Sequence, residues 1–209
     1  MNSCKVEICG EELLLFPEKV IFWKKERTLI VSDLHLAKAG HFRKHGIPVS
    51  GKIHLTDLKI LDKLITSLHP SEVILLGDLF HSFRNNEWND FMRFINVFDM
   101  VKFTLVRGNH DIEEDYPAEL EVIDILEKDP FSFTHQREKT KGYNLSGHIH
   151  PGFRIKGLAR DGLTIPCFHF SNTFGVLPAF GQFTGIRKIR PIEGDRIFGI
   201  ADDSIIELI

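Results

Sequence analysis

The sequence predicts an α/β sandwich in which two β-sheets pack face to face and helices cover their outer faces. Three observations support this fold class. Residues 5–31 consist of short apolar or alternating runs separated by turn-forming residues. Helical and strand-like segments then alternate through the middle of the chain. From about residue 131 onward the pattern returns to short strands punctuated by Gly and Pro. A helical middle between two strand-rich ends is typical of two sheets with helices outside.

The first segment predicts a set of hairpin-linked strands. The runs VEI, LLLF, VIFW and TLIV are separated by the turn-like stretches GEE, PEK and KKER. Runs of four or so apolar residues bounded by such clusters are typical of strands.

The middle segment predicts helices and buried strands in alternation. Residues 55–68 and 88–98 carry large apolar side chains at helical spacing. In the second of these helices we interpret Trp88 and the apolar residues that follow it as core. Two buried strands, EVILLGD and VKFTLVRGNHD, lie before and after that helix. This order favours a parallel or mixed sheet.

The last segment predicts further short strands, at FSFTH, YNLSGHIH, LTIPCFHF, VLPAF and RIFGI. The sequence contains no repeat, low-complexity tract or linker, so we expect one domain over residues 1–209.

Composition places the chain among ordinary globular proteins. It has 209 residues, 43% hydrophobic and 26% charged, with a formal net charge of −3. No apolar run approaches the roughly 18 residues of a membrane span, and the start lacks the pattern of a signal peptide. Three cysteines without CxxC spacing favour reduced thiols. We therefore expect a soluble cytoplasmic protein without a uniformly basic surface.

Polar residues end five of the predicted strands. TLIVSD leads to Asp33 and His35, and VILLGD ends at Asp78. The next three strands lead to Asn109, His110 and Asp111, to His135, and to His148 and His150. Alternation along an extended chain predicts that Asp33 and His35 face the same way. Because ligands bind at the carboxyl ends of strands in open α/β sheets, we expect one polar site there.

These residue types favour a site for two divalent metal ions. Carboxylate, amide oxygen and imidazole suit Mn²⁺, Fe²⁺ or Zn²⁺, and Mn²⁺ is the ion we expect. Seven candidate ligands are too many for one ion and fit two ions bridged by a carboxylate. Glycines before Asp78, Asn109 and His148 suit tight turns. The candidate ligands are Asp33, His35, Asp78, Asn109, His135, His148 and His150.

The ordered motifs DLH (33–35), GD (77–78), GNHD (108–111), a lone His135 and GHIH (147–150) resemble those of the calcineurin-like metallophosphoesterases. The resemblance implies a four-layer αββα fold. It implies that Asp33, His35, Asp78 and His150 hold one metal, and that Asp78, Asn109, His135 and His148 hold the other. His110 would face the scissile phosphate without being a ligand. The lone histidine stands in THQR, where many relatives have a flanking Gly.

A resemblance along nearly the whole chain points to the bacterial DNA-ligase-associated metallophosphoesterases. It rests on stretches such as DLHLAKAGHFRKHGIPV, GHIHP and LPAFGQFTG. It implies a DNA-repair nuclease or phosphodiesterase associated with a DNA ligase and a helicase. GDLFHS also resembles the double-strand-break-repair nucleases, which makes His81 a second catalytic candidate.

A basic run after the first ligands is a candidate for phosphate contact. The stretch KAGHFRKHGIPVSGK contains Lys38, Arg43 and Lys44, and DNA is the partner it would suit. A solvated surface is the alternative interpretation of this run. Arg84 and Arg137 are further candidates. The remaining histidines, His41, His45, His54, His69 and His169, we interpret as solvated or structurally satisfied.

We interpret the chain as a two-metal phosphoesterase that cleaves nucleic-acid phosphodiesters. An alternative keeps the site but takes small nucleotides or phosphomonoesters as substrates. Another alternative is a non-catalytic scaffold of the same fold, against which the complete ligand set and His110 weigh. Metal-dependent hydrolysis of a chromogenic phosphodiester discriminates the enzymes from the scaffold.

Overall fold

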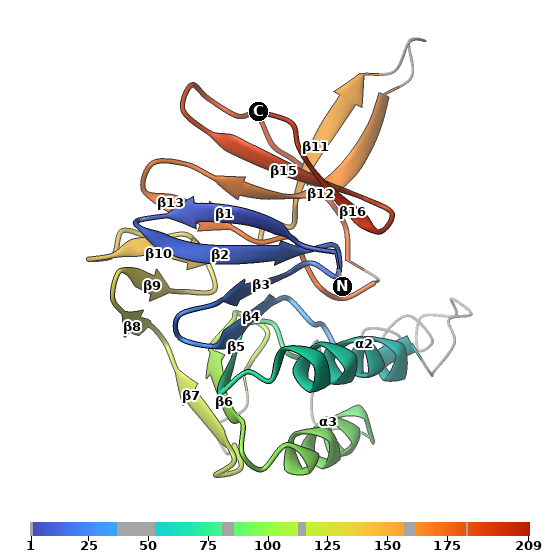
Figure 1. Ribbon diagram of the computed structural model, residues 1–209. Coiled ribbons are helices and arrows are strands. Elements are labelled where there is room, and N and C mark those ends of the chain that lie inside the picture. Colours follow the sequence, from blue (N-terminus) through green and yellow to red (C-terminus); the bar gives the residue numbers. More distant parts are fainter. Residues whose placement is uncertain (1, 37–52, 81–85, 113–115, 157–161, 183) are drawn as a thin grey trace.

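Two β-sheets pack against each other in the computed structural model (Figure 1). The structure describes residues 2–36, 53–80, 86–112, 116–156, 162–182 and 184–209. The prediction of two packed mixed sheets is confirmed.

The first sheet has the strand order β1-β2-β3-β4-β5-β6-β7. Its first four strands are antiparallel neighbours, as predicted for hairpins, and β4 to β7 are parallel. The strands are β1 (Cys4–Ile8), β2 (Glu11–Phe16), β3 (Val20–Trp23), β4 (Thr28–Ser32), β5 (Glu72–Leu76), β6 (Lys102–Val106) and β7 (Leu120–Ile123).

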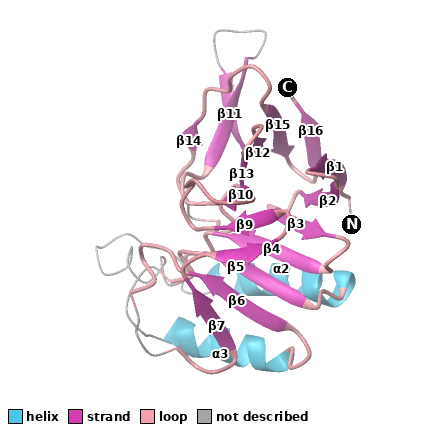
Figure 2. Ribbon diagram, turned by 90° about the vertical axis from the view of Figure 1, so that its left-hand side faces the viewer, coloured by secondary structure: helices cyan, strands magenta, loops and turns pink. Residues whose placement is uncertain are grey.

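Two helices cover the face of the first sheet that points away from the second sheet (Figure 2). They are α2 (Ile53–Leu68) and α3 (Asn86–Val97), within two residues of the predicted bounds. Their apolar side chains join one core cluster with the facing side chains of β4, β5 and β6, and this cluster includes Leu61, Trp88 and Phe91. The interpretation of Trp88 as a core residue is therefore confirmed.

The second sheet has the order β14-β11-β12-β13-β10-β9-β8, and β15 pairs with both β12 and β16. Its strands are β8 (Leu126–Lys128), β9 (Phe131–Phe133), β10 (Tyr143–Ser146), β11 (Pro151–Lys156), β12 (Gly162–Phe170), β13 (Phe174–Val176), β14 (Arg187–Lys188), β15 (Arg196–Ala201) and β16 (Ser204–Glu207). Between the sheets lies a second core cluster rich in aromatic residues, including Trp23, Phe131 and Phe168.

The outward face of the second sheet carries buried polar side chains. The Asn144 amide donates a hydrogen bond of 2.8 Å to the Thr134 hydroxyl, and the backbone N–H of Gly142 donates one of 3.0 Å to Ser132. Alternation puts these side chains opposite the apolar residues that face the first sheet. Both helices of the described residues cover the first sheet, so we find no described helix over this polar face.

Several boundaries differ from the prediction. The stretch VLPAF was predicted as a strand, but β13 ends at Val176, because Pro178 has no N–H to continue a strand ladder. The strands β7, β8, β11, β14 and β16 were not predicted; they are short or lack a clear apolar run. No helix in the described part of the chain has the length and apolarity to cross a membrane.

Candidate metal centre

The carboxyl ends of three neighbouring strands bring the first motifs together. β4, β5 and β6 are parallel and in register, so the residues after Ser32, Leu76 and Val106 lie at one edge of the first sheet. The backbone N–H of His35 donates to the carbonyl of Asp78 over 2.9 Å, which joins the first two motifs.

The second sheet supplies the histidines of the last two motifs. β9 and β10 are parallel neighbours, and His135 and GHIH follow their carboxyl ends. The N–H of Gly147 donates to the carbonyl of His135 over 3.0 Å. The site is therefore built where both sheets end on the same side of the sandwich.

Three side chains form a first group of candidate ligands: Asp33, His35 and His150. The two Nε2 atoms of the histidines are 3.4 Å apart, and Nε2 of His150 lies 3.2 Å from Oδ1 of Asp33. Atoms that bind one ion at about 2.1 Å lie roughly 3–3.5 Å from one another. These spacings therefore fit ligands of a single ion.

A second group consists of Asp78, His135 and His148. Nε2 of His135 lies 3.0 Å from Nδ1 of His148 and 3.4 Å from Oδ1 of Asp78. The side-chain oxygen of Asn109 is 3.1 Å from the same Nε2 atom. Asn109 therefore extends this group to four side chains.

Asp78 faces both groups. Its Oδ1 atom points to His135, and its Oδ2 atom lies 3.8 Å from Nε2 of His35. The side chain is 4% exposed, so its two oxygens are directed into the site and not into solvent. Such a carboxylate can bridge two ions.

The histidine rings are oriented by carbonyl groups behind them. Nδ1 of His135 lies 3.0 Å from the carbonyl of Leu76, and Nδ1 of His150 lies 3.0 Å from that of Gly185. A proton on Nδ1 donated to a carbonyl leaves the Nε2 lone pair for a metal. For His148, burial and then the nearby His135 lower the pKa, which favours the neutral, ligating form.

Asp33 presents one oxygen to the site and uses the other for structure. Its Oδ2 atom accepts hydrogen bonds from the Ser32 hydroxyl and, over 2.9 Å, from the N–H of His148. Its buried Oδ1 atom has no hydrogen-bond partner and faces His150. Burial raises the pKa of Asp33, but His150 and Ser32 outweigh it and hold the pKa below its ordinary value. The residue is therefore an anion with one oxygen available to a cation.

Most of the candidate ligands lie in the left-handed backbone region, which corrects one prediction. β4 ends at Ser32, so Asp33 and His35 do not share a direction through strand alternation. Non-glycine residues rarely adopt positive φ, and such residues gather at functional sites. Those with positive φ are Asp33 (52°), His35 (48°), Asp78 (50°), His148 (69°) and His150 (49°).

The motif glycines serve close packing more than turn formation. Of the motif glycines Gly77, Gly108 and Gly147, only Gly77 has a positive φ, of 71°. A Cβ atom on Gly77 would overlap the His135 ring, and one on Gly147 would overlap Ser32 and Asp33. The expectation of tight turns is therefore confirmed only for Gly77. Gly147 is needed because the ligand loops approach each other closely.

Asp111 joins two of the motif loops, a role that was not predicted from the sequence. Its Oδ1 atom accepts hydrogen bonds from the N–H groups of Leu79 (2.9 Å) and Phe80 (3.3 Å), and its Oδ2 atom accepts one from Gly108 (2.9 Å). The side chain thus ties the GD loop to the GNHD loop. The motif position was visible in the sequence, but its inward direction was not.

His110 lies at the border of the site and solvent. Its side chain is 41% exposed, and its Nε2 atom is 3.9 Å from Oδ2 of Asp78. Its backbone N–H donates to Oδ1 of Asp78 over 3.1 Å. The imidazole therefore stands beside the candidate ligands and is open to a substrate.

Other candidates lie outside the described residues or away from the site. His81, Lys38, Arg43, Lys44 and Arg84 fall outside the described residues, as do His41 and His45. His169 is buried, and its Nε2 atom lies 2.8 Å from Asp195. That pairing satisfies one ring nitrogen of His169, and its buried Nδ1 atom has no hydrogen-bond partner.

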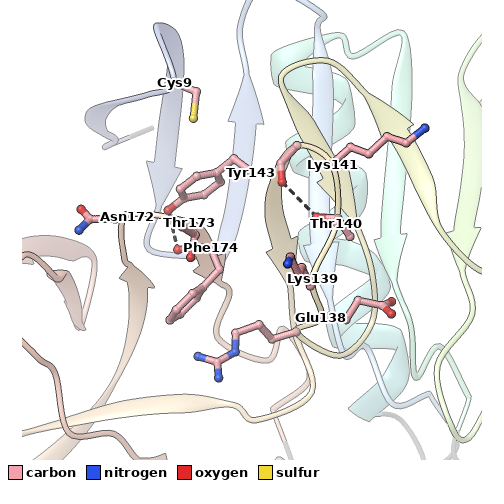
Figure 3. Close-up of a pocket in the computed structure, with 11 residues that line it drawn as sticks. Cys9, Glu138, Lys139, Thr140, Lys141, Tyr143, Asn172, Thr173 and Phe174 are labelled. Atoms are coloured by element: carbon pink, nitrogen blue, oxygen red, sulfur yellow. Dashed lines mark hydrogen bonds between the residues drawn. The ribbon is translucent and has the colours of Figure 1, made fainter.

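A cavity of about 810 Å³ lies elsewhere in the second sheet (Figure 3). It is lined by Tyr143 and Phe174, which begin β10 and β13, and by residues 137–142. The guanidinium of Arg137 lies 4.4 Å from the centre of the Phe174 ring. The candidate ligands follow the carboxyl ends of β9 and β10, so this cavity is at the opposite end of those strands.

The fold and the two ligand groups define a metal-dependent hydrolase with two candidate metal sites. The chain belongs to the calcineurin-like phosphoesterase family, whose model matches residues 26–203. It is a metal-dependent phosphoesterase.

Two solved structures are similar to this chain. The chain is similar to the nuclease MPE of Pseudomonas putida, with 29% identity, a TM-score of 0.82 and coverage of 99% of this chain and 100% of that one. It also matches the phosphoesterase Yfce of E. coli, with 13% identity, a TM-score of 0.41 and coverage of 86% and 96%. A comparison with curated proteins gives no match.

Proposed function

We propose that the protein is a two-metal phosphodiesterase that cleaves DNA. The observation that carries the proposal is the position of Asp78, whose two oxygens face two separate groups of ligand atoms. Two ions joined by a carboxylate are the arrangement used for in-line displacement at phosphorus.

The residues fit this assignment chemically. Asp33, His35, His150 and Asp78 would hold one ion; Asp78, Asn109, His135 and His148 would hold the other. The donors are carboxylate, amide and imidazole without thiolate, a set that suits Mn²⁺, with Fe²⁺ or Zn²⁺ also compatible. When bound, such ions supply Lewis acidity to the phosphoryl oxygens and activate the attacking water.

Residues of the chain orient the candidate ligands and can supply a proton to the departing oxygen. The carbonyls behind His135 and His150 fix the ring directions, and Asp111 fixes the loops that carry Asp78 and Asn109. His110 is the exposed imidazole beside the site. We assign it the role of stabilising or protonating the departing oxygen, which is ordinary general-acid work for histidine.

The choice of DNA over small substrates rests on the likeness to the Pseudomonas putida nuclease, which spans almost the whole of both chains. Ligand chemistry alone suits any phosphoester, so the substrate must be tested directly. The DNA-repair role and the association with a DNA ligase and a helicase are implied by the sequence resemblance. They stay predictions, which co-purification of the protein from its own cells with each partner would test.

The deciding experiment compares substrates with Mn²⁺ supplied. Purified protein is incubated with single-stranded, nicked and duplex DNA, with bis(p-nitrophenyl) phosphate and with p-nitrophenyl phosphate. We expect cleavage of DNA and of the chromogenic diester, abolished by chelator and restored by Mn²⁺. Hydrolysis of the small esters with no cleavage of any DNA would instead favour a small-molecule phosphoesterase. No hydrolysis of any substrate with bound metal would favour the scaffold.

A further inference from the structure

The strand β11 begins at the candidate metal centre and runs away from it. Pro151, its first residue, directly follows His150. The edge strand β14 is parallel to it: the N–H of Arg187 donates to the carbonyl of His150 over 3.0 Å, and that of Ile189 to Gly152 over 2.9 Å. β14 flanks the beginning of β11 beside His150, and the hairpin of β11 and β12 projects away from the first sheet (Figures 1 and 2).

The register shows which side chains share a face of this edge. Gly152 is paired with Lys188, and Arg187 with Pro151. A Cβ atom on Gly152 would meet the methyl groups of Ile186 and Thr164. Because side chains two residues apart share a face, this face also carries Lys188 and Arg154, while Arg187 points to the opposite face. We call it the Gly152 face.

The basic side chains of the Gly152 face are exposed to solvent. Arg154 and Lys188 are exposed, and so is Arg190, which lies two residues after Lys188 and just beyond the end of β14. Within the described residues no ion pair joins any of these three side chains to a carboxylate. Three exposed cations thus lie on β11 and on or just after β14, the strands that follow and flank His150, in a chain whose net charge is −3.

A cavity of about 200 Å³ lies between His150 and the apolar part of this face. His150 lines it together with Pro166 and Ile186 of the Gly152 face, and Lys19 lies on its wall. Nδ1 of His150 also contacts the carbonyl of Gly185, one residue before Ile186. Lys188 is paired with Gly152, two residues after His150, so a strand held at the metal centre would lie close to this cation.

We propose that the Gly152 face, through Arg154 and Lys188 and with the neighbouring Arg190, binds the phosphate backbone of the DNA strand that is held at the metal centre. This inference rests on the proposed function and adds the surface that makes DNA the substrate. Contacts to phosphates position a strand without reading its sequence. The face would therefore favour long substrates over small diesters of the same chemistry.

The test measures binding of a labelled phosphorothioate oligonucleotide, single-stranded and duplex, by fluorescence anisotropy over a series of salt concentrations. Each phosphate contact contributes about 0.7–0.9 to the slope of log K against log salt. We expect Lys188→Ala combined with Arg190→Ala to flatten the slope by about 1.4–1.8. Hydrolysis of bis(p-nitrophenyl) phosphate should be unchanged, which also shows that the variant is folded.

Two matched controls make the test specific. Arg187→Ala removes one charge from the same strand but from the opposite face, and it should leave the slope unchanged. Lys139→Ala combined with Lys141→Ala removes two charges at the cavity of Figure 3, at the other end of the sheet. This double variant should also leave the slope of log K against log salt unchanged.

The outcomes separate this inference from the proposed function. If the wild-type protein cleaves DNA but the Lys188 and Arg190 double variant keeps the wild-type salt slope, DNA binding by the Gly152 face is refuted. The proposed DNA-cleaving function then still stands. An equal effect of Arg187→Ala refutes the assignment to one face. If the wild-type protein hydrolyses small diesters and does not bind DNA, the DNA function itself fails and this inference fails with it.

Discussion

Removal of the Asp111 carboxylate should destabilise the loops that carry Asp78 and Asn109, although Asp111 is not itself a candidate ligand. The side chain is 3% exposed and accepts three hydrogen bonds from backbone N–H groups of two loops. A buried donor left without its acceptor costs about 1–3 kcal/mol. In Asp111→Ala all three donors lose their partner, so we expect a loss of roughly 3–5 kcal/mol in the free energy of unfolding, near the upper end for one substitution.

Asp111→Asn is the graded comparison. An amide oxygen in place of Oδ1 still accepts from Leu79 and Phe80, whereas its NH₂ group faces the N–H of Gly108. One hydrogen bond is lost, and we expect a smaller cost of about 1–3 kcal/mol. Urea unfolding with chelator present gives the free energies, and a metal titration of each variant gives affinity. Equal stability of wild type and Asp111→Ala, with equal metal affinity, would refute the assigned role.

Three further substitutions test the site and the fold. His110→Ala should keep both metals and DNA affinity while kcat falls by about 10²–10⁴; loss of the metals would make His110 a ligand. Gly147→Ala should weaken metal binding and lower stability by about 1–3 kcal/mol, because its methyl group overlaps Asp33; unchanged metal affinity would contradict this. For Glu72, burial raises the pKa, but hydrogen bonds from Lys128 and Thr104 outweigh it and lower the pKa from 4.5. Glu72→Gln should therefore cost about 1.5–3 kcal/mol at neutral pH, and the difference should vanish as the pH falls through the lowered pKa; a constant difference down to pH 2 would contradict the assignment.

The parts of the fold with strong local signals could be predicted from the sequence. Apolar periodicity gave α2 and α3 to within two residues, and the hairpin strands β1 to β4 follow from their turn residues. β14 could not be found this way, because its two residues, Arg187 and Lys188, pair only through β11. A strand of two residues forms because it pairs with β11, and it is too short to show an apolar or alternating pattern in the sequence.

In the candidate site, too, some features could be predicted from the sequence and others depend on contacts between distant residues. Motif order brought the seven candidate ligands into one prediction, and the structure gathers them. The cause of their convergence was predicted wrongly for Asp33 and His35: left-handed backbone, and not strand alternation, directs them. Backbone strain depends on the packing of distant loops, such as Gly147 against Ser32, which no local pattern reports.

The role of Asp78 as the shared ligand is the central claim, and metal stoichiometry tests it most directly. Wild-type, Asn109→Ala and Asp78→Ala proteins are loaded with Mn²⁺, freed of excess ion by gel filtration, and measured by elemental analysis. Because Asp78 faces both ligand groups and Asn109 only one, we expect two ions per chain in the wild type, about one in Asn109→Ala, and neither ion firmly held in Asp78→Ala. Two tightly bound ions in Asp78→Ala would contradict the account.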